Sequence, residues 1–481
     1  MFMTRCLLIC LAVTLHAIMA RGDFVIYSIP GSDAAFVLEG KAKILGLGVI
    51  EFTHPMGTIA LSRDNTTVIK CPTRQEEFER LFLQAKRSGT IEDYLTAANQ
   101  ALRRGLLKEF RECCNAAYRI DSNHPTIQRL LEARRRIKAP IQDDDRPLNE
   151  LKGFVDRSNM EVVTSPHYVM LHDTGSAKGG KGRQTRAEKR LELLEKVYES
   201  YFLKFALDGT LLPCPDERLK VVLFGDERDY LRFSTQLDAS LASALGYWSP
   251  GNNTAVFFDQ GTTQRMRALQ NLSAELQRQK QKTRGTPASK ETAHLANTLE
   301  LLVKIIREED DIEVVSHEAT HQLAGNTGLM PRNKIAMRWA HEGLASYFET
   351  SSDAGWGGIG AVNQGRLKGY RRVSSDPQRA PIELLVSDLL FDQAQDGRQR
   401  SDAYGQAWAL THFLMETRGE TLVDYYQRIS ELSDSDQGIR RGDLIDHFRD
   451  SFGDLRALES QWHQYMVELK TDVDRMRDAM R

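Results

Sequence analysis

The chain has 481 residues, and its 64 lysines and arginines nearly balance its 66 aspartates and glutamates, so the formal net charge is −2 at pH 7. This balance creates no overall electrostatic field, and we expect neither a nucleic-acid partner nor binding to an anionic membrane surface. Hydrophobic residues make up 41% and charged residues 27% of the chain, which excludes a mostly disordered, collagen-like or coiled-coil protein. A chain of this length folds into roughly two to four domains.

The longest apolar run of the sequence lies near its start. Within residues 1–20, one arginine precedes this run, and Ala20 is followed by the polar pair Arg21-Gly22. This order is typical of a secretory signal peptide, which we predict to be cleaved near Ala20. A membrane anchor is the alternative, but about 15 apolar residues are fewer than the roughly 20 that a bilayer requires. We therefore expect a secreted, periplasmic or cell-envelope protein without a transmembrane span after cleavage.

Four cysteines lie outside this segment, at Cys71, Cys113, Cys114 and Cys214. They are too few for a disulfide scaffold, and the adjacent Cys113 and Cys114 are not expected to bond to each other, so the sequence leaves the disulfide state open. The chain has no CxxC spacing, which argues against a cysteine-based zinc or redox site.

Two small modules are expected before the main domain. Residues 21–72 alternate apolar and polar positions in short runs broken by glycine and proline, which predicts a β-rich module. Over residues 73–138 the apolar period becomes helical, and the two segments around Gly105 resemble a single degenerate tetratricopeptide (TPR) unit. Because about three such units are needed for a stable array, we expect a helical connector here, with a partner-binding module as the alternative.

The acidic residues 139–159 contain two prolines and show no apolar period, so we predict a linker there. Residues 160–430 then alternate strand and helix patterns and are expected to form the main domain. Within this domain, residues 262–294 are rich in Gln, Arg and Lys and poor in apolar residues, which indicates an exposed insertion, either helical or disordered. Residues 431–481 have a helical period and are expected to cap the main domain.

The residues that suggest chemistry lie in the stretch 310–328, DDIEVVSHEATHQLAGNTG. Its apolar residues have helical spacing, so His317 and His321 are expected four residues apart on one helix face, where two imidazoles can bind one tetrahedral metal ion. Glu318, one position round the helix, can act as general base toward a water on that ion. This is the HExxH arrangement of zinc peptidases. The alternative is a pair of surface histidines that bind no metal.

A third metal ligand is expected on the next helix. We predict that the first helix begins at Asp311 and ends near Gly325, and that a second helix lies within residues 333–350. Glu342 on this second helix is the predicted third ligand, because an antiparallel partner can aim a carboxylate back at the two histidines. The adjacent His341 points about 100° away round the helix, so only one of the pair can face the metal.

The run His317-Glu318-Ala319-Thr320-His321, followed by Trp339-Ala340-His341-Glu342-Gly343-Leu344-Ala345, resembles the gluzincin metallopeptidases. The closest resemblance is to the peptidase-MA-like group of secreted bacterial proteins. It covers roughly residues 160–430 and implies an α+β, thermolysin-like zinc peptidase core that acts on a peptide or protein substrate. It also implies that residues 245–260 supply an edge strand on the substrate side.

Hydrolysis of a peptide bond passes through a tetrahedral intermediate with a negatively charged oxygen, the oxyanion. A further hydrogen-bond donor is needed to stabilise it. We predict this role for Tyr404, at the start of a later helix, because the gluzincin resemblance implies an oxyanion-stabilising tyrosine there; a buried core tyrosine is the alternative. Carboxylates that orient the metal-binding histidines are also required, and Glu349 and Asp388 are the candidates. His412 lies about 12 Å further along the predicted helix of Tyr404 and is expected to be structural.

The substrate is expected to bind by strand addition beside residues 254–258, with an ordinary core strand as the alternative. Together these patterns predict a secreted zinc-dependent peptidase with Zn²⁺ bound by His317, His321 and Glu342. The alternative function is a non-catalytic cell-envelope binding or scaffold protein with a vestigial or structural metal site.

Overall fold

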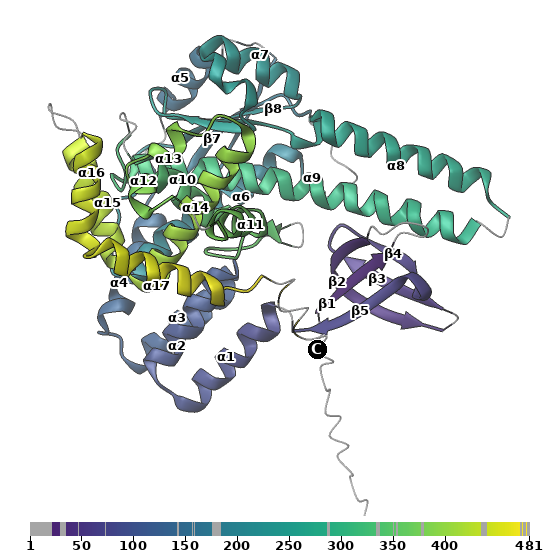
Figure 1. Cartoon of the computed structure of the whole chain (residues 1–481), viewed down its shortest axis with the longest axis horizontal. Coiled ribbons are helices and arrows are strands. Elements are labelled where there is room, and N and C mark those ends of the chain that lie inside the picture. The colour runs from purple at the N-terminus through teal and green to yellow at the C-terminus, as the bar shows by residue number, and fades with distance from the viewer. Residues whose placement is uncertain are drawn as a thin grey trace, which may run out of the picture.

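The computed structural model has a mixed α+β fold (Figure 1). It describes residues 22–28, 35–46, 48–72, 74–141, 144–155, 157, 159–175, 184–285, 289–332, 337–349, 351–352, 355–376, 380–433, 440–471, 474 and 478. The predicted signal peptide, residues 1–20, lies outside this part of the chain. Within the described part, no helix combines the length and the apolar character needed to cross a bilayer.

The described chain begins with an antiparallel five-stranded sheet, whose strand order is β4-β3-β2-β1-β5. Its strands are β1 (Gly22–Ser28), β2 (Ala35–Leu45), β3 (Val49–His54), β4 (Gly57–Ser62) and β5 (Thr66–Cys71), with the short 3-10 helix η1 (Arg63–Asn65) before β5. Alternate residues such as Val25, Ile50 and Phe52 are buried on one face. That face packs against Leu301 and Leu302 on the first half of helix α9 (Ser289–Asn326), beside which the sheet lies in Figure 1.

Four helices follow this sheet: α1 (Arg74–Ser88), α2 (Ile91–Arg103), α3 (Leu107–Ile120) and α4 (Pro125–Ile137). Most of their buried residues, among them Ala101, Phe110 and Leu130, belong to the same hydrophobic cluster as the helices further along the chain, while others form a small cluster of their own. The helices expected as a connector are therefore packed into the main core. The structure has Cys113 and Cys114 as buried free thiols.

The central sheet has five strands in the order β6-β7-β8-β10-β9. They are β6 (Glu161–Thr164), β7 (Tyr168–His172), β8 (Leu219–Phe224), β9 (Gly246–Ser249) and β10 (Thr254–Phe258). β7, β8 and β10 run parallel, and the antiparallel β6 and β9 form the two edges. The expectation of a free edge beside residues 254–258 is wrong, because β10 pairs on both sides and all five of its residues are buried. An entirely apolar strand is stable only when both of its faces are covered.

Helices cover both faces of the central sheet, as the alternation within its strands requires. Tyr168, Met170 and Val221 face the large core formed with α6 (Arg186–Leu207) and α9. Val169 and Val222 face a smaller core. That core is closed by α5 (Arg146–Val155) and α7 (Glu227–Leu237). The segment expected as a linker, residues 139–159, thus contains a helix that is part of a core.

α8 (Gln264–Lys282) and α9 (Ser289–Asn326) form a long helical hairpin that projects from the rest of the fold (Figure 1). Most of the insertion expected at residues 262–294 is therefore helical. The expectation that the HExxH helix begins at Asp311 is wrong, because α9 is one continuous helix of 38 residues. Asp311 lies inside it and is buried, and its carboxylate pairs with Arg186 and Arg190 at 2.7 and 3.1 Å. Two 3-10 helices precede the hairpin, η2 (Ala239–Ser243) and η3 (Gln260–Thr262).

The remaining chain is mainly helical. Its elements are α10 (Arg338–Phe348), β11 (Ser351–Ser352), β12 (Gly355–Trp356), α11 (Gln364–Ser374), α12 (Ile382–Val386), α13 (Leu389–Asp392), α14 (Gly397–Thr417), α15 (Gly419–Ser433), α16 (Arg441–Phe452) and α17 (Leu455–Glu468). Their large buried residues, such as Trp339, Trp408 and Phe448, join the main core. Within the expected C-terminal cap, residues 431–481, the described helices α16 and α17 contribute buried residues such as Phe448 and Trp462 to that core.

Candidate metal centre

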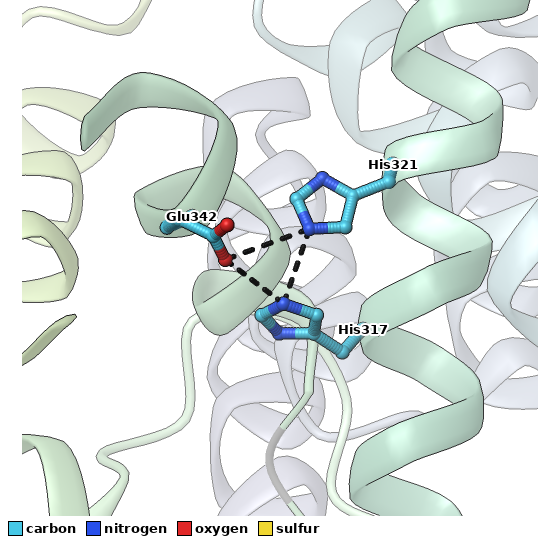
Figure 2. Close-up of side chains that lie close together, drawn as sticks. All are labelled: His317, His321 and Glu342. Carbon is cyan, nitrogen blue, oxygen red and sulfur yellow. Dashed lines mark hydrogen bonds and ion pairs between the residues drawn. The ribbon is translucent and has the colours of Figure 1, made fainter. Parts of the chain in front are cut away.

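His317 and His321 lie on the second half of α9, one turn apart, and point to the same side of the helix (Figure 2). Their Nε2 atoms are 3.1 Å from each other. Ser316 and Thr320 beside them turn their hydroxyls back onto the carbonyls of residues four positions earlier, and both are buried. The side of α9 that carries Ser316 and Thr320 is therefore packed into the core. This packing fixes the helix that carries the two imidazoles.

Glu342 reaches the two histidines from α10, as Figure 2 shows. Its Oε2 lies 3.2 Å from Nε2 of His317 and 3.6 Å from Nε2 of His321. Although burial acts to raise it, hydrogen bonding with the two histidines holds the pKa of Glu342 well below its usual value. Glu342 is therefore ionised in this arrangement.

The spacing of these three atoms suits one metal ion. Ligand atoms that each lie about 2.0–2.1 Å from a tetrahedral zinc are about 3.3–3.4 Å from one another. The observed separations are 3.1, 3.2 and 3.6 Å. The three side chains together form a group that could hold a metal ion, and two imidazoles with one carboxylate are a donor set that zinc prefers. Three protein ligands leave the fourth tetrahedral position for a water or substrate.

The position of α10 depends on contacts from two distant segments. Asp388 accepts hydrogen bonds from the backbone N–H groups of Arg338 and Trp339 at 2.8 and 3.0 Å, so it caps the start of α10. A Cβ atom at Gly343 would lie 2.7 Å from the carbonyl oxygen of Ala407 on α14, so only glycine permits this close approach. Asp388, expected as a partner of a histidine, instead supports the helix that carries Glu342.

Glu349, at the end of α10, is the carboxylate that orients His317. Its Oε2 lies 2.7 Å from Nδ1 of His317. It also accepts hydrogen bonds from Arg366 (2.7 and 3.0 Å) and from Asn363 (2.9 Å). Although burial opposes ionisation, Arg366 and His317 lower the pKa of Glu349 to about 2. An ionised Glu349 requires a proton on Nδ1 of His317, which leaves Nε2 of His317 free to bind a metal.

Glu318 lies on α9 next to these ligands and faces the edge strand β9. It is 8% exposed, and the backbone N–H of Trp248 lies near enough to its carboxylate to favour the charged form. A Cβ atom at Gly246 would lie 3.3 Å from Cγ of Glu318, so the strand and the side chain are in close contact. Burial raises the pKa of Glu318, and the nearby Glu342 adds to this, while His317 and His321 act in the opposite direction. A raised pKa suits a group that takes up a proton near neutral pH.

Tyr404 also lies at the site, although its position in the helix differs from the one expected. α14 begins at Gly397, so Tyr404 is inside the helix and not at its start. The guanidinium of Arg366 lies 4.9 Å from the centre of its ring. Burial and the charge of Glu342 raise the pKa of Tyr404, so its hydroxyl keeps its proton and can donate it in a hydrogen bond.

Two other histidines near the site have different surroundings. The ring of His341 lies 6.2 Å from that of His321, and burial together with the charge of His321 lowers the pKa of His341 to about 4. It is Glu342, not His341, that belongs to the group able to hold a metal. His412 is buried, with its two ring nitrogens 3.1 Å from the carbonyl oxygen of Gly360 and 3.0 Å from the hydroxyl of Tyr465. These contacts match the structural role expected for His412.

The sequence did not reveal Arg366, Asn363 or the N–H of Trp248 as parts of the site. Arg366 and Asn363 come from the start of α11, where no motif marks them. The amide of Trp248 carries no signal in the sequence, because every residue except proline has the same group.

A model of the family described as a protein of unknown function, DUF1570, matches residues 311–434, which is less than half of the chain. No curated protein and no solved structure matches the chain. The matched part contains the side chains of the site: His317, Glu318, His321, Glu342, Glu349, Arg366 and Tyr404. Because the description of this family names no activity, the chemistry of the site is the basis for assigning a function.

Proposed function

We propose that this chain is a zinc-dependent peptidase of the gluzincin type with a thermolysin-like core, related to the peptidase-MA-like group and active outside the cytoplasm. One observation carries the proposal: Nε2 of His317, Nε2 of His321 and Oε2 of Glu342 lie 3.1–3.6 Å apart, with the buried Glu318 beside them. The first three would hold zinc, and the fourth is placed as a general base. This combination of donors with an adjacent carboxylate supports hydrolysis better than a structural metal site does, because a structural site is closed by four protein ligands.

Zinc bound in such a site polarises a carbonyl group and acidifies a water molecule. Glu318 accepts the proton of the attacking water and passes it to the departing amine. Tyr404 donates its hydroxyl proton in a hydrogen bond to the developing oxyanion. Glu349 keeps the proton on Nδ1 of His317 throughout.

The edge strand β9 is the proposed binding surface for an extended peptide. It pairs with β10 on one side only, and its Trp248 amide touches Glu318. A peptide added to the outer side of β9 would therefore pass the general base, and its backbone would pair with the free backbone groups of the strand. This binding mode accepts many sequences, because the main-chain hydrogen bonds do not depend on side chains.

The test compares the purified protein with Glu318→Gln. We expect about one zinc per chain in both proteins, and a loss of peptide hydrolysis of at least roughly 100-fold in the variant, the usual contribution of a general base. Glu300→Gln is the matched control, because Glu300 lies on the same helix and its partners within the described part of the chain are Gln277 and Lys304, far from the site. Normal hydrolysis by Glu318→Gln would contradict the general-base role. Zinc binding without hydrolysis of any peptide in a broad library would favour a scaffold protein with a structural metal.

A further inference from the structure

The turn between α2 and α3 packs directly against the segment that follows β12. A Cβ atom at Gly105 would lie 3.1 Å from the carbonyl oxygen of Trp356, and one at Gly358 would collide with the backbone of residues 103–105. Gly105 and Gly358 both have positive φ, at 69° and 91°. Two glycines in left-handed conformation thus let two backbones, about 250 residues apart in the sequence, touch.

Arg103, at the end of α2, makes the polar contacts of this junction. Its Nη1 donates to Glu416 on α14 at 2.9 Å, and its Nη2 donates to the carbonyl oxygen of Gly360 at 3.4 Å. The other carboxylate oxygen of Glu416 accepts a hydrogen bond from the hydroxyl of Tyr347 at 2.6 Å. Tyr347 lies on α10, just over one turn beyond Glu342. Arg103 therefore contacts α10 through a single carboxylate.

The same segment continues into the groups that orient His317. Gly360 donates its N–H to the carbonyl oxygen of Tyr347 at 2.8 Å. Three residues later, Asn363 donates to Glu349 at 2.9 Å, and Glu349 lies 2.7 Å from Nδ1 of His317. Within residues 357–363, Arg103 thus holds Gly360, and Asn363 contacts Glu349, the carboxylate that orients His317.

We propose that Arg103 is a positioning residue for the metal centre. By binding Glu416 and Gly360 it holds the end of α10 and residues 357–363 in the arrangement that directs Glu349 at His317. The N-terminal helices are then part of the support of the metal site, and not a separate module for a protein partner. This inference rests on the metal-binding part of the proposed function and does not depend on hydrolysis.

The test measures zinc affinity by competition with a chelator in the full-length protein. We expect Arg103→Met to weaken zinc binding about tenfold, the lower end of the range for residues behind the ligands. Arg103→Lys should lose less zinc affinity than Arg103→Met, because lysine keeps a positive charge near Glu416. The matched control is Arg104→Met. In the wild type Arg104 pairs with Glu77 on α1, so this change removes an arginine of the same turn and keeps the contacts of Arg103. The double variant Arg103→Met/Glu416→Gln should bind zinc no more weakly than the weaker of the two single variants, because both changes break one link.

A purely structural role predicts a different result. In that case Arg103→Met would lower the melting temperature of the metal-free protein but leave the zinc affinity unchanged, and the proposal would be overturned. If Arg103→Met does not fold, Tyr347→Phe tests the same link from the α10 side.

A second measurement needs no metal. Nuclear magnetic resonance of labelled histidine should show the Nδ1–H proton of His317 less protected from exchange in Arg103→Met than in Arg104→Met, and equal protection would contradict the proposal. A wild-type protein that binds no zinc would refute the proposed function while this comparison still tests the inference.

Discussion

The carboxylate of Glu349 lies 2.7 Å from Nδ1 of His317, on the opposite side of the ring from the nitrogen that faces His321 and Glu342. This contact decides which nitrogen of His317 can bind a metal, because a ring nitrogen that carries a proton cannot donate a lone pair. Glu349 is in turn held by Arg366, whose guanidinium also lies against the ring of Tyr404. One arginine thus supports a proposed metal ligand and the proposed oxyanion donor together.

The first prediction concerns Glu349→Gln. We expect zinc affinity to fall by about 10- to 100-fold, because the neutral amide no longer favours the proton on Nδ1 of His317 and leaves Arg366 without its counter-charge. Chelator competition measures the change. Glu300→Gln on the first half of α9, far from the site, is the control and should bind zinc as the wild type does. An unchanged affinity in Glu349→Gln would show that this carboxylate does not orient His317.

The second prediction concerns Tyr404→Phe. We expect kcat to fall by about 100- to 1000-fold while zinc content and KM stay close to wild type, because the hydroxyl acts only on the oxyanion. Tyr425→Phe is the matched control, since the hydroxyl of Tyr425 is buried without a hydrogen-bond partner among the described residues. It should leave kcat unchanged. Equal hydrolysis by the two variants would make Tyr404 a core residue without a role in the reaction.

The third prediction concerns the cap of α10. We expect Asp388→Ala to lower the free energy of unfolding by about 1–2 kcal/mol, because the N–H groups of Arg338 and Trp339 lose their acceptor. Urea denaturation measures this change. Asp446→Ala should alter it by less than about 0.5 kcal/mol, since Asp446 is exposed and, among the described residues, pairs only with the nearby Arg449. A loss in Asp388→Ala no greater than that of the control would mean that the cap does not stabilise α10.

The fourth prediction concerns pH. Burial lowers the pKa of His412 to about 4, whereas an unfolded histidine has a pKa of about 6.5. The unfolded state therefore binds this proton first, so His412 makes the protein less stable as the pH falls from about 6.5 to about 4 and has no such effect above that range. The full effect is roughly 3 kcal/mol, at about 1.4 kcal/mol per pKa unit.

Unfolding free energies measured between pH 7 and pH 4 test this prediction. His412→Gln cannot take up the proton, so its stability should fall less steeply with decreasing pH than that of the wild type, whatever its stability at pH 7. Parallel curves for the two proteins would contradict the prediction.

Much of the local structure could be predicted from the sequence. The alternation in β1 to β5 and the apolar spacing of the helices come from periods of two and 3.6 residues, which are properties of the chain itself. The four-residue spacing of His317 and His321 placed them on one helix face for the same reason. Where prediction failed, a longer-range contact decided the structure: Asp311 looked like a helix cap, but its burial against Arg186 and Arg190 lets α9 continue through it.

The sequence by itself determined that two imidazoles share one helix face with a glutamate one position round the helix, because backbone geometry alone sets that relationship. Only the tertiary structure decided that Glu342 approaches them within 3.2–3.6 Å, that Glu349 and Arg366 stand behind His317, and that Arg103 from α2 supports the same region. These contacts join residues from separate elements, and their distances depend on how whole helices pack. Packing depends on the combined shape of many side chains, which no local pattern in a single sequence records.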